Sequence, residues 1–123
     1  MEISYVAGFF DGEGCICISK HTSTVIRREG YHLVASISQR KKETLIEIQK
    51  IFGGRIYGNG DGRSFRWEVV RKNEAQTFLT TILPHLQLKR SQAKVGLLFL
   101  DLDSGWHQGE RELCRKIIKM LKE

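Results

Sequence analysis

Two pairs of short segments with alternating apolar and polar residues constrain the fold of this chain most strongly. Residues 15–21 and 31–39 alternate on either side of a long polar turn, and residues 55–58 and 64–71 alternate on either side of the glycine-rich sequence NGDG. Alternation with a period of two is typical of strands that bury one face. Each pair is therefore expected to form an antiparallel hairpin with one apolar face and one open face.

Helical patterns precede, separate and follow these hairpins. The spacing of apolar residues predicts helices over residues 4–12, 42–52 and 73–83, and two more over 91–102 and 110–121. Ser4 is a candidate N-cap of the first helix, which is expected to be buried all round. The order αββαββα with extra C-terminal helices predicts an α+β fold, in which helices cover the apolar face of a four-stranded antiparallel sheet.

The length of the chain fits a single domain over residues 1–123, with a core at 3–103 and a C-terminal helical extension at 104–123. No apolar run reaches the roughly 18 residues of a membrane span, and the N-terminus lacks a basic region and a cleavage site. We therefore expect a cytosolic or organelle-internal protein that is neither secreted nor in a membrane. Cys15, Cys17 and Cys114 match neither a disulfide framework nor a zinc site.

The positive charge is concentrated in the middle of the chain. Residues 20–72 carry 12 Lys and Arg against five acids, a net charge of +7, whereas the other 70 residues have a net charge of −1. Such a concentration favours a phosphate-facing surface, although a basic face kept for solubility has the same composition.

Most residues of the predicted open face lie within this basic segment. A sheet surface of this kind can enter the major groove of DNA and read base edges, although a plain solvated sheet would look similar. With the neighbouring arginines, the predicted DNA-binding residues are Cys17, Ser19, His21, Arg27, Arg28, His32, Val34, Ser36, Ser38, Arg40, Arg55, Tyr57, Asn59, Arg63, Ser64, Arg66 and Glu68.

Two carboxylates, Asp11 and Glu13, lie where the first helix is expected to end. A helix C-terminus carries partial negative charge, so a nearby cation, exposure to water or a bound divalent metal must offset them. Gly8 and Gly12 are four residues apart and, with Ala7, are expected to leave one helix face bare for another backbone. The motif occurs once, so a second copy of the chain would supply the opposing helix.

The sequence VAGFFDGEG at residues 6–14 resembles the LAGLIDADG motif of homing endonucleases, with Glu13 in place of the second aspartate. The segments ISQ at 37–39, FGG at 52–54 and LPHLQLKRSQA at 83–93 match the layout of the single-motif subfamily in the same order. The resemblance covers roughly residues 3–103. It leaves the last segment, from Gly105 onward, without a recognised motif.

The resemblance implies a homodimer that cleaves both strands of a long, partly palindromic DNA site with Mg²⁺ and leaves 3′ overhangs. It implies that Glu13 and the Gly14 carbonyl bind the metal. It also implies that Gln39 positions water and that Lys89 lies near the scissile phosphate. The implied catalytic side chains are therefore Glu13, Gln39 and Lys89. Gln39 has the parity of the buried face, so its predicted role requires a bulge. The implied dimer interface contains Ala7, Gly8, Asp11 and Gly12, and Asp11 is structural.

Two other functions remain open from the sequence. A relative that has lost cleavage would act as an RNA maturase or as a DNA-binding regulator, although the matching residues Glu13, Gln39 and Lys89 argue against this. A basic scaffold that binds nucleic acid without sequence preference is the second.

Overall fold

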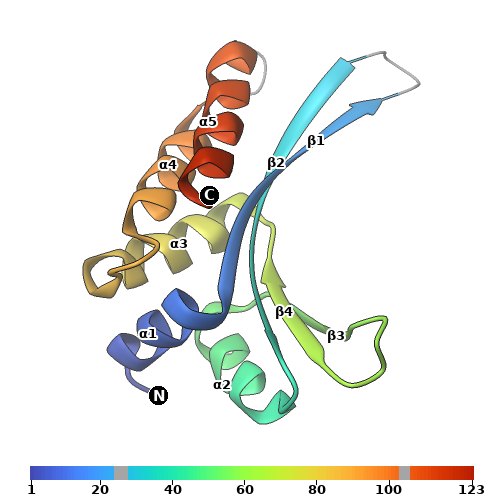
Figure 1. Cartoon of the computed structure of the whole chain (residues 1–123), viewed down its shortest axis with the longest axis vertical. Helices are drawn as coiled ribbons and strands as arrows, with labels where there is room; N and C mark the ends of the chain where they lie inside the picture. Colours follow the sequence, from blue (N-terminus) through green and yellow to red (C-terminus); the bar gives the residue numbers. More distant parts are fainter. Residues whose placement is uncertain (24–27, 103–105) are drawn as a thin grey trace.

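The computed structural model describes residues 1–23, 28–102 and 106–123, without the side chains at 22, 23, 28 and 29. It forms a twisted sheet with helices on one side (Figure 1). The elements are α1 (Ile3–Glu13), β1 (Gly14–Ser23), β2 (Arg28–Gln39), α2 (Lys42–Phe52), β3 (Arg55–Gly58), β4 (Phe65–Val69), α3 (Lys72–Ile82), the 3₁₀ turn η1 (Leu83–His85), α4 (Arg90–Asp101) and α5 (Gln108–Leu121).

The sheet has four strands in the order β1-β2-β4-β3, and every neighbouring pair is antiparallel. The long β1–β2 hairpin pairs from Gly14 with Ile37 out to Ser23 with Arg28. The second hairpin joins it through β4, which pairs with the last residues of β2. The predicted α+β fold is confirmed.

The core lies between the helices and the apolar face of the sheet. The Phe78 ring meets the rings of Phe10, Phe52 and Trp67 edge-on, with centroids 4.9–5.2 Å apart. The buried indole of Trp67 donates to the Gly53 carbonyl at 2.8 Å, which fixes the end of α2 against β4. Aromatic residues of α1, α2, α3 and β4 therefore pack together and hold the second hairpin on the helices.

The structure corrects the prediction for the first helix in two ways. The helix begins at Ile3 after Glu2, and no side chain caps it, so Ser4 is not the N-cap. The helix is not buried all round, because Tyr5 is 58% exposed and Gly8 is exposed, while Val6 and Phe10 are fully buried. Only one side of this apolar helix has core to pack against within a single chain.

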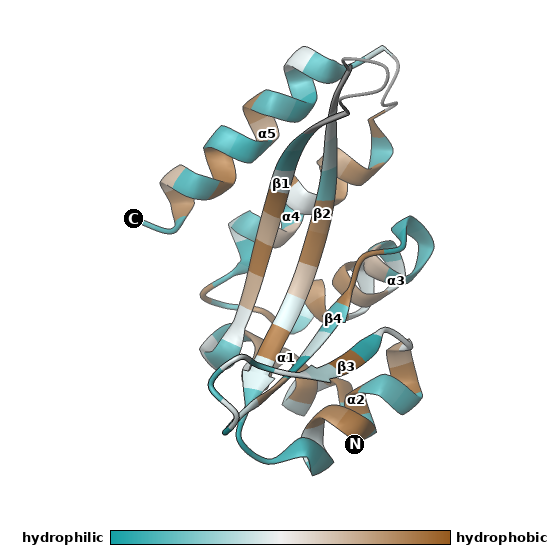
Figure 2. Ribbon diagram, turned by 90° about the vertical axis from the view of Figure 1, so that its right-hand side faces the viewer, coloured by the Kyte–Doolittle hydropathy of each residue, from teal (hydrophilic) through white to brown (hydrophobic). Residues whose placement is uncertain are grey.

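Helix α5, which no motif explained, is part of the same fold. It lies beside α4 and β1 (Figure 1), and hydrophobic and hydrophilic segments alternate along it (Figure 2). The Arg111 guanidinium is 4.1 Å from the Phe99 ring centroid and donates to the carbonyls of Leu102 at 2.9 Å and Tyr31 at 2.8 Å. A buried arginine thus ties α5 to α4 and β2. Among the residues described, no helix is long and apolar enough to cross a membrane.

Candidate active site and nucleic-acid interface

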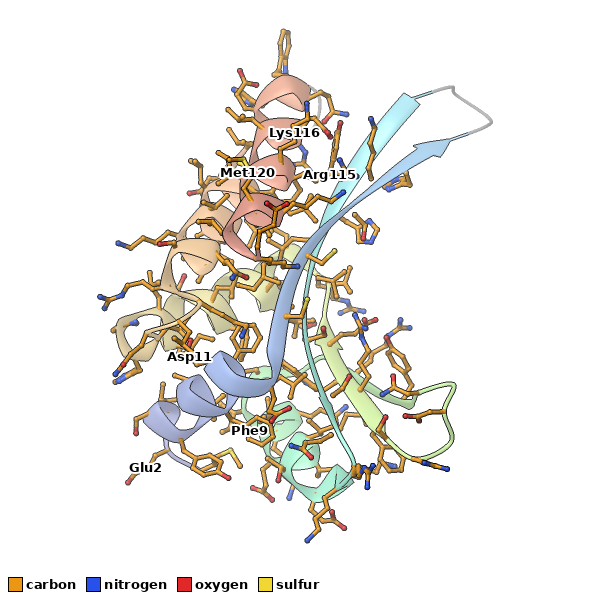
Figure 3. All side chains as sticks on the ribbon, viewed as in Figure 1. Glu2, Phe9, Asp11, Arg115, Lys116 and Met120 are labelled. Carbon is orange, nitrogen blue, oxygen red and sulfur yellow. The ribbon has the colours of Figure 1, made fainter. Side chains whose placement is uncertain are left out.

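The carboxylate of Asp11 is a structural tie between α1 and the segment that leads into α4. Its two oxygens accept the backbone N–H groups of Gln87 at 2.7 Å and Lys89 at 3.0 Å. Asp11 is 9% exposed and lies between α1 and this segment (Figure 3). Because both oxygens are already used, Asp11 is poorly placed to bind a metal.

Lys89 supplies the positive charge that the end of α1 needs. Its ammonium group donates to the carbonyl oxygen of Asp11 at 2.6 Å, in the last turn of the helix. A cation at a helix C-terminus is favourable because unpaired carbonyls there carry partial negative charge. The structure therefore brings the Lys89 ammonium group to the carbonyl of Asp11, which lies two residues before Glu13 in the helix.

Glu13 and Gly14 form the junction between α1 and β1. Glu13 is the last helical residue and is exposed, so its carboxylate is free to approach a ligand. Gly14 turns the chain directly into the strand, and a Cβ at this position would lie 2.6 Å from the Phe10 carbonyl oxygen. Only glycine fits so close to the helix, which explains the Glu-Gly pair at this point.

Gln39 ends β2 at the same end of the sheet as Glu13, since Gly14 pairs with Ile37. The pairing of β2 with β4 continues without interruption to Gln39, which lies opposite Phe65, so no bulge turns Gln39 to the open face. Its side-chain oxygen accepts the N–H of Arg40 at 3.1 Å. This is the contact expected of a strand-end amide, and the catalytic role of Gln39 stays a prediction.

The open face carries the predicted residues in rows across the strands. One row runs over all four strands, from Cys15 to Ser36, Glu68 and Arg55. The next contains Ser38, Arg66 and Tyr57. Farther along the long hairpin, facing pairs are Cys17 with Val34 and Ser19 with His32, and the His21 and His32 rings are 5.5 Å apart. The predicted parity is confirmed.

Not every predicted residue is available on this face. Ser36 is only 5% exposed, so a direct DNA contact by Ser36 is not supported, because its neighbours cover it. Arg27 and the side chain of Arg28 lie outside the described residues. Arg40 and Arg63 are exposed at the end of the sheet that carries the β3–β4 turn.

The β3–β4 turn is held by its own polar side chains. The Asp61 carboxylate accepts the N–H groups of Arg63 at 2.9 Å and Ser64 at 3.1 Å, and also the Ser64 hydroxyl at 3.0 Å. Asn59 donates to the same hydroxyl oxygen at 2.7 Å. The two backbone bonds, followed by the hydroxyl, hold the pKa of Asp61 below its usual value. Asn59 and Ser64 thus fix the turn that presents Arg63.

The predicted interface on α1 is smaller than the sequence indicated. Gly8 and Gly12 are exposed, and a Cβ on either would meet nothing within 4 Å. Ala7 is fully buried in its own chain, so it was wrongly assigned to the bare helix face. Asp11, which was predicted as a structural residue at the interface, is 9% exposed. Exposed Tyr5 and Leu88, 58% and 78% accessible, lie beside Gly8 and were not part of the predicted interface.

A cation from α5 also reaches this region. The Lys122 ammonium lies 3.4 Å from the sulfur of Cys15, two residues beyond Glu13 and on the open face. The three cysteines are free, and Cys15 is exposed. The position of Lys122, which directly follows α5, could not be predicted, because the sequence does not reveal where this helix packs.

A metal ion would find few protein oxygens here in a single chain. Within the described part of the chain, no three His, Cys, Asp or Glu side chains cluster in a way that could hold a metal. The donor set of Glu13 carboxylate and Gly14 carbonyl is one of hard oxygens, which suits Mg²⁺ but is incomplete. Further oxygens would have to come from water, from phosphate or from another chain.

Comparisons with known proteins agree with the motif. The model of the LAGLIDADG endonuclease family matches residues 6–102. DNA endonuclease I-CvuI of Chlorella vulgaris is 36% identical over 106 residues, covering 79% of this chain. Intron-encoded DNA endonuclease ai2b of Dictyostelium discoideum is 32% identical over 68 residues, covering 55% of this chain. The alignments span only 62% and 24% of these two relatives.

The fold has a close counterpart among solved structures. The crystal structure of I-CvuI in complex with the I-CreI target superimposes with a TM-score of 0.85 and 28% identity, covering 97% of this chain and 80% of that one. That complex was obtained with 2 mM Mg and its DNA is not cleaved.

Proposed function

Because the chain belongs to the LAGLIDADG endonuclease family, we propose that it is a site-specific endonuclease that makes staggered, metal-dependent double-strand breaks in DNA. The observation that carries the proposal is the open face of the sheet. Its rows of arginine and hydrogen-bonding side chains end beside the exposed carboxylate of Glu13.

Double-stranded DNA is the proposed partner of this face. Residues 20–72, with a net charge of +7, provide the phosphate contacts that give affinity and make it salt-dependent. A strand surface in the major groove can hydrogen-bond to base edges, which gives sequence preference. The exposed arginines Arg40 and Arg63 suit the first role, and the partly covered Arg66 suits the second.

Mg²⁺ held by the Glu13 carboxylate and the Gly14 carbonyl would neutralise charge on the phosphoryl oxygens and lower the pKa of an attacking water. Lys89, whose ammonium now bonds to the Asp11 carbonyl, would place a second positive charge near the scissile phosphate. Gln39 would orient water, since an amide is no base. To do so, Gln39 must give up the N–H of Arg40 and turn its side chain away from the buried-face side of β2, because no bulge turns it outward.

A homodimer would complete the site. The chain carries one motif and one sheet, which would cover half of the DNA site. Exposed Gly8 and Gly12 allow a second α1 helix to approach closely. A two-fold axis there would bring two Glu13 carboxylates together and lay two sheets along a long, partly palindromic site. The family resemblance adds 3′ overhangs and a role in intron mobility, within the cytosol or an organelle.

Cleavage of the cognate junction tests the proposal. The protein is incubated with Mg²⁺ or with Ca²⁺ and with duplex DNA that contains the insertion site of its own gene, without the intron. We expect staggered double-strand cleavage with Mg²⁺ and binding without cleavage with Ca²⁺. Intact DNA with every divalent ion, together with tight RNA binding, would instead favour an RNA maturase, and tight DNA binding alone would favour a regulator.

A further inference from the structure

Four side chains on β3 and β4 form a compact block on the open face. Arg55 lies directly opposite Glu68, and Tyr57 lies directly opposite Arg66. Residues two apart in a strand point to the same side, so the four side chains occupy neighbouring positions in two rows. The block contains two cations, one anion and one phenol.

Glu68 is the centre of this block. Its Oε2 accepts the Tyr57 hydroxyl at 2.9 Å and lies 3.5 Å from Nε of Arg66. Its Oε1 lies 3.5 Å from an Nη of Arg55. The side chain of Glu68 is 11% exposed, whereas those of Arg66 and Arg55 are 35% and 80% exposed. The carboxylate therefore lies beneath the guanidinium groups that reach outward.

This arrangement argues against Glu68 itself reading a base. A carboxylate that reads cytosine must accept the N4 amino hydrogen with a free oxygen, and both oxygens of Glu68 already face donors. Glu68 accepts one hydrogen bond, from Tyr57, and forms ion pairs at 3.5 Å with Arg55 and Arg66, so its partners come from both strands. The geometry instead limits how far Arg55 and Arg66 can move.

Two physical effects follow for the arginines. A guanidinium held in place loses less conformational freedom when it bonds to a base edge. The negative charge beneath it also weakens its attraction to phosphate without removing its N–H donors. Both effects favour the directional contact with base acceptors, such as O6 and N7 of guanine, over a loose contact with the DNA backbone.

We propose that Glu68 is a positioning residue for sequence specificity, which holds Arg55, Arg66 and Tyr57 as a preformed unit for reading base edges. The proposal rests on the proposed function, because it assumes that the open face binds DNA. It reassigns Glu68 from a DNA contact, as the sequence indicated, to a residue that acts through the two arginines. Tyr57 and Glu68 then matter for discrimination more than for affinity.

Selection from a library of randomised duplexes tests this inference, with Ca²⁺ present so that no DNA is cut. We compare the wild-type protein with Glu68→Gln and with the control Glu47→Gln. Glu47 is 51% exposed on α2, where it pairs with Lys50, so the control makes the same charge change away from the sheet. For Glu68→Gln we expect preference to fall about 10-fold at one or two positions per half-site.

Affinity for random DNA provides a second readout. A released arginine makes an additional phosphate contact, so Glu68→Gln should bind random duplex more tightly, with a salt slope steeper by about one. A role confined to stability would leave this slope unchanged. Tyr57→Phe removes one hydrogen bond and keeps every charge, and we expect a smaller loss of preference with an unchanged slope.

The outcomes separate the two proposals. A wild-type protein that enriches no sequence would contradict the proposed function. If the wild type enriches a sequence and folded Glu68→Gln enriches it with equal stringency, the positioning role of Glu68 is overturned. If circular dichroism shows that Glu68→Gln does not fold, Tyr57→Phe is the deciding variant. A sequence preference of Tyr57→Phe equal to that of the wild type at every position overturns the positioning role of Glu68.

Discussion

At the scale of single residues, Glu13 and Asp11 illustrate how two acids in one motif have different environments. Asp11 is enclosed by backbone donors, whereas Glu13 is exposed two residues later. Their positions at the end of an apolar helix were evident from the sequence, but the N–H groups that bond to Asp11 come from residues 87 and 89. Local patterns contain no information on such distant partners.

We predict that Glu13→Gln abolishes DNA cleavage and preserves DNA binding. The amide keeps the shape of the side chain but lacks the negative charge that a hard divalent cation requires. The rate of cutting in Mg²⁺ should fall at least about 100-fold, while affinity in Ca²⁺ changes little. Glu2→Gln, at the other end of α1, is the matched control and should cut normally. Near wild-type cutting by Glu13→Gln would remove Glu13 from the site.

We predict that Asp11→Asn lowers the free energy of unfolding by about 1–3 kcal/mol. An asparagine offers one acceptor oxygen, so its NH₂ group must face the N–H of either Gln87 or Lys89 in a nearly buried place. Urea unfolding measures the change. Asp101→Asn, which keeps an oxygen for its exposed contact with Gln76, should cost less than about 0.5 kcal/mol. Equal midpoints for the two variants would contradict the structural role of Asp11.

At the scale of elements, helices and strands followed from periodicity almost throughout. The double glycine after α2 has φ values of 79° and 85°, which explains why the chain leaves the helix there as predicted. The strand order was not predictable, because alternation does not reveal which strand of the second hairpin pairs with β2. Helix α5 was predicted, but its place against α4 and β2 depends on Arg111, which donates to the carbonyls of Leu102 and Tyr31.

We predict that the β3–β4 turn loosens in acid because of Asp61. The pKa of Asp61 is lowered in the folded chain, chiefly by the N–H groups of Arg63 and Ser64. The stabilisation is therefore complete above the ordinary pKa of 3.8 and is lost as the pH falls through the lower folded pKa. The amide hydrogen exchange rates of Arg63 and Ser64, corrected for the intrinsic exchange rate at each pH, should rise in this range.

An Asp61→Asn variant is the control for this titration. It retains one acceptor oxygen and cannot ionise, so protection of the two amides should be weaker and should no longer depend on pH through a carboxylate. Identical acid-dependent profiles for Asp61→Asn and the wild type would assign the titration to another group.

In the molecule as a whole, the exposed side of α1 is the surface that would need a partner. The exposed side of this helix carries Tyr5, Gly8 and Gly12, and the exposed side chain of Leu88 lies beside Gly8. The sequence predicted the close approach of a second helix, but it could not distinguish Ala7, which faces the core of its own chain. That distinction depends on how α1 is rotated against α3, which is a property of the packed molecule.

We predict that the protein is a dimer on DNA and that Gly8→Leu makes it monomeric. A Cβ at Gly8 would meet nothing within 4 Å in its own chain, and leucine favours the helix by about 0.5–1 kcal/mol, so each monomer should fold at least as well. Gly109→Leu is a matched control, since Gly109 is also helical and also has open space around it. Light scattering after size exclusion, with and without duplex, should show dimers on DNA for the wild type and for the control, but not for Gly8→Leu. A wild-type protein that is monomeric even on DNA would leave the second half of the binding site without a source, and dimeric Gly8→Leu would move the interface away from α1.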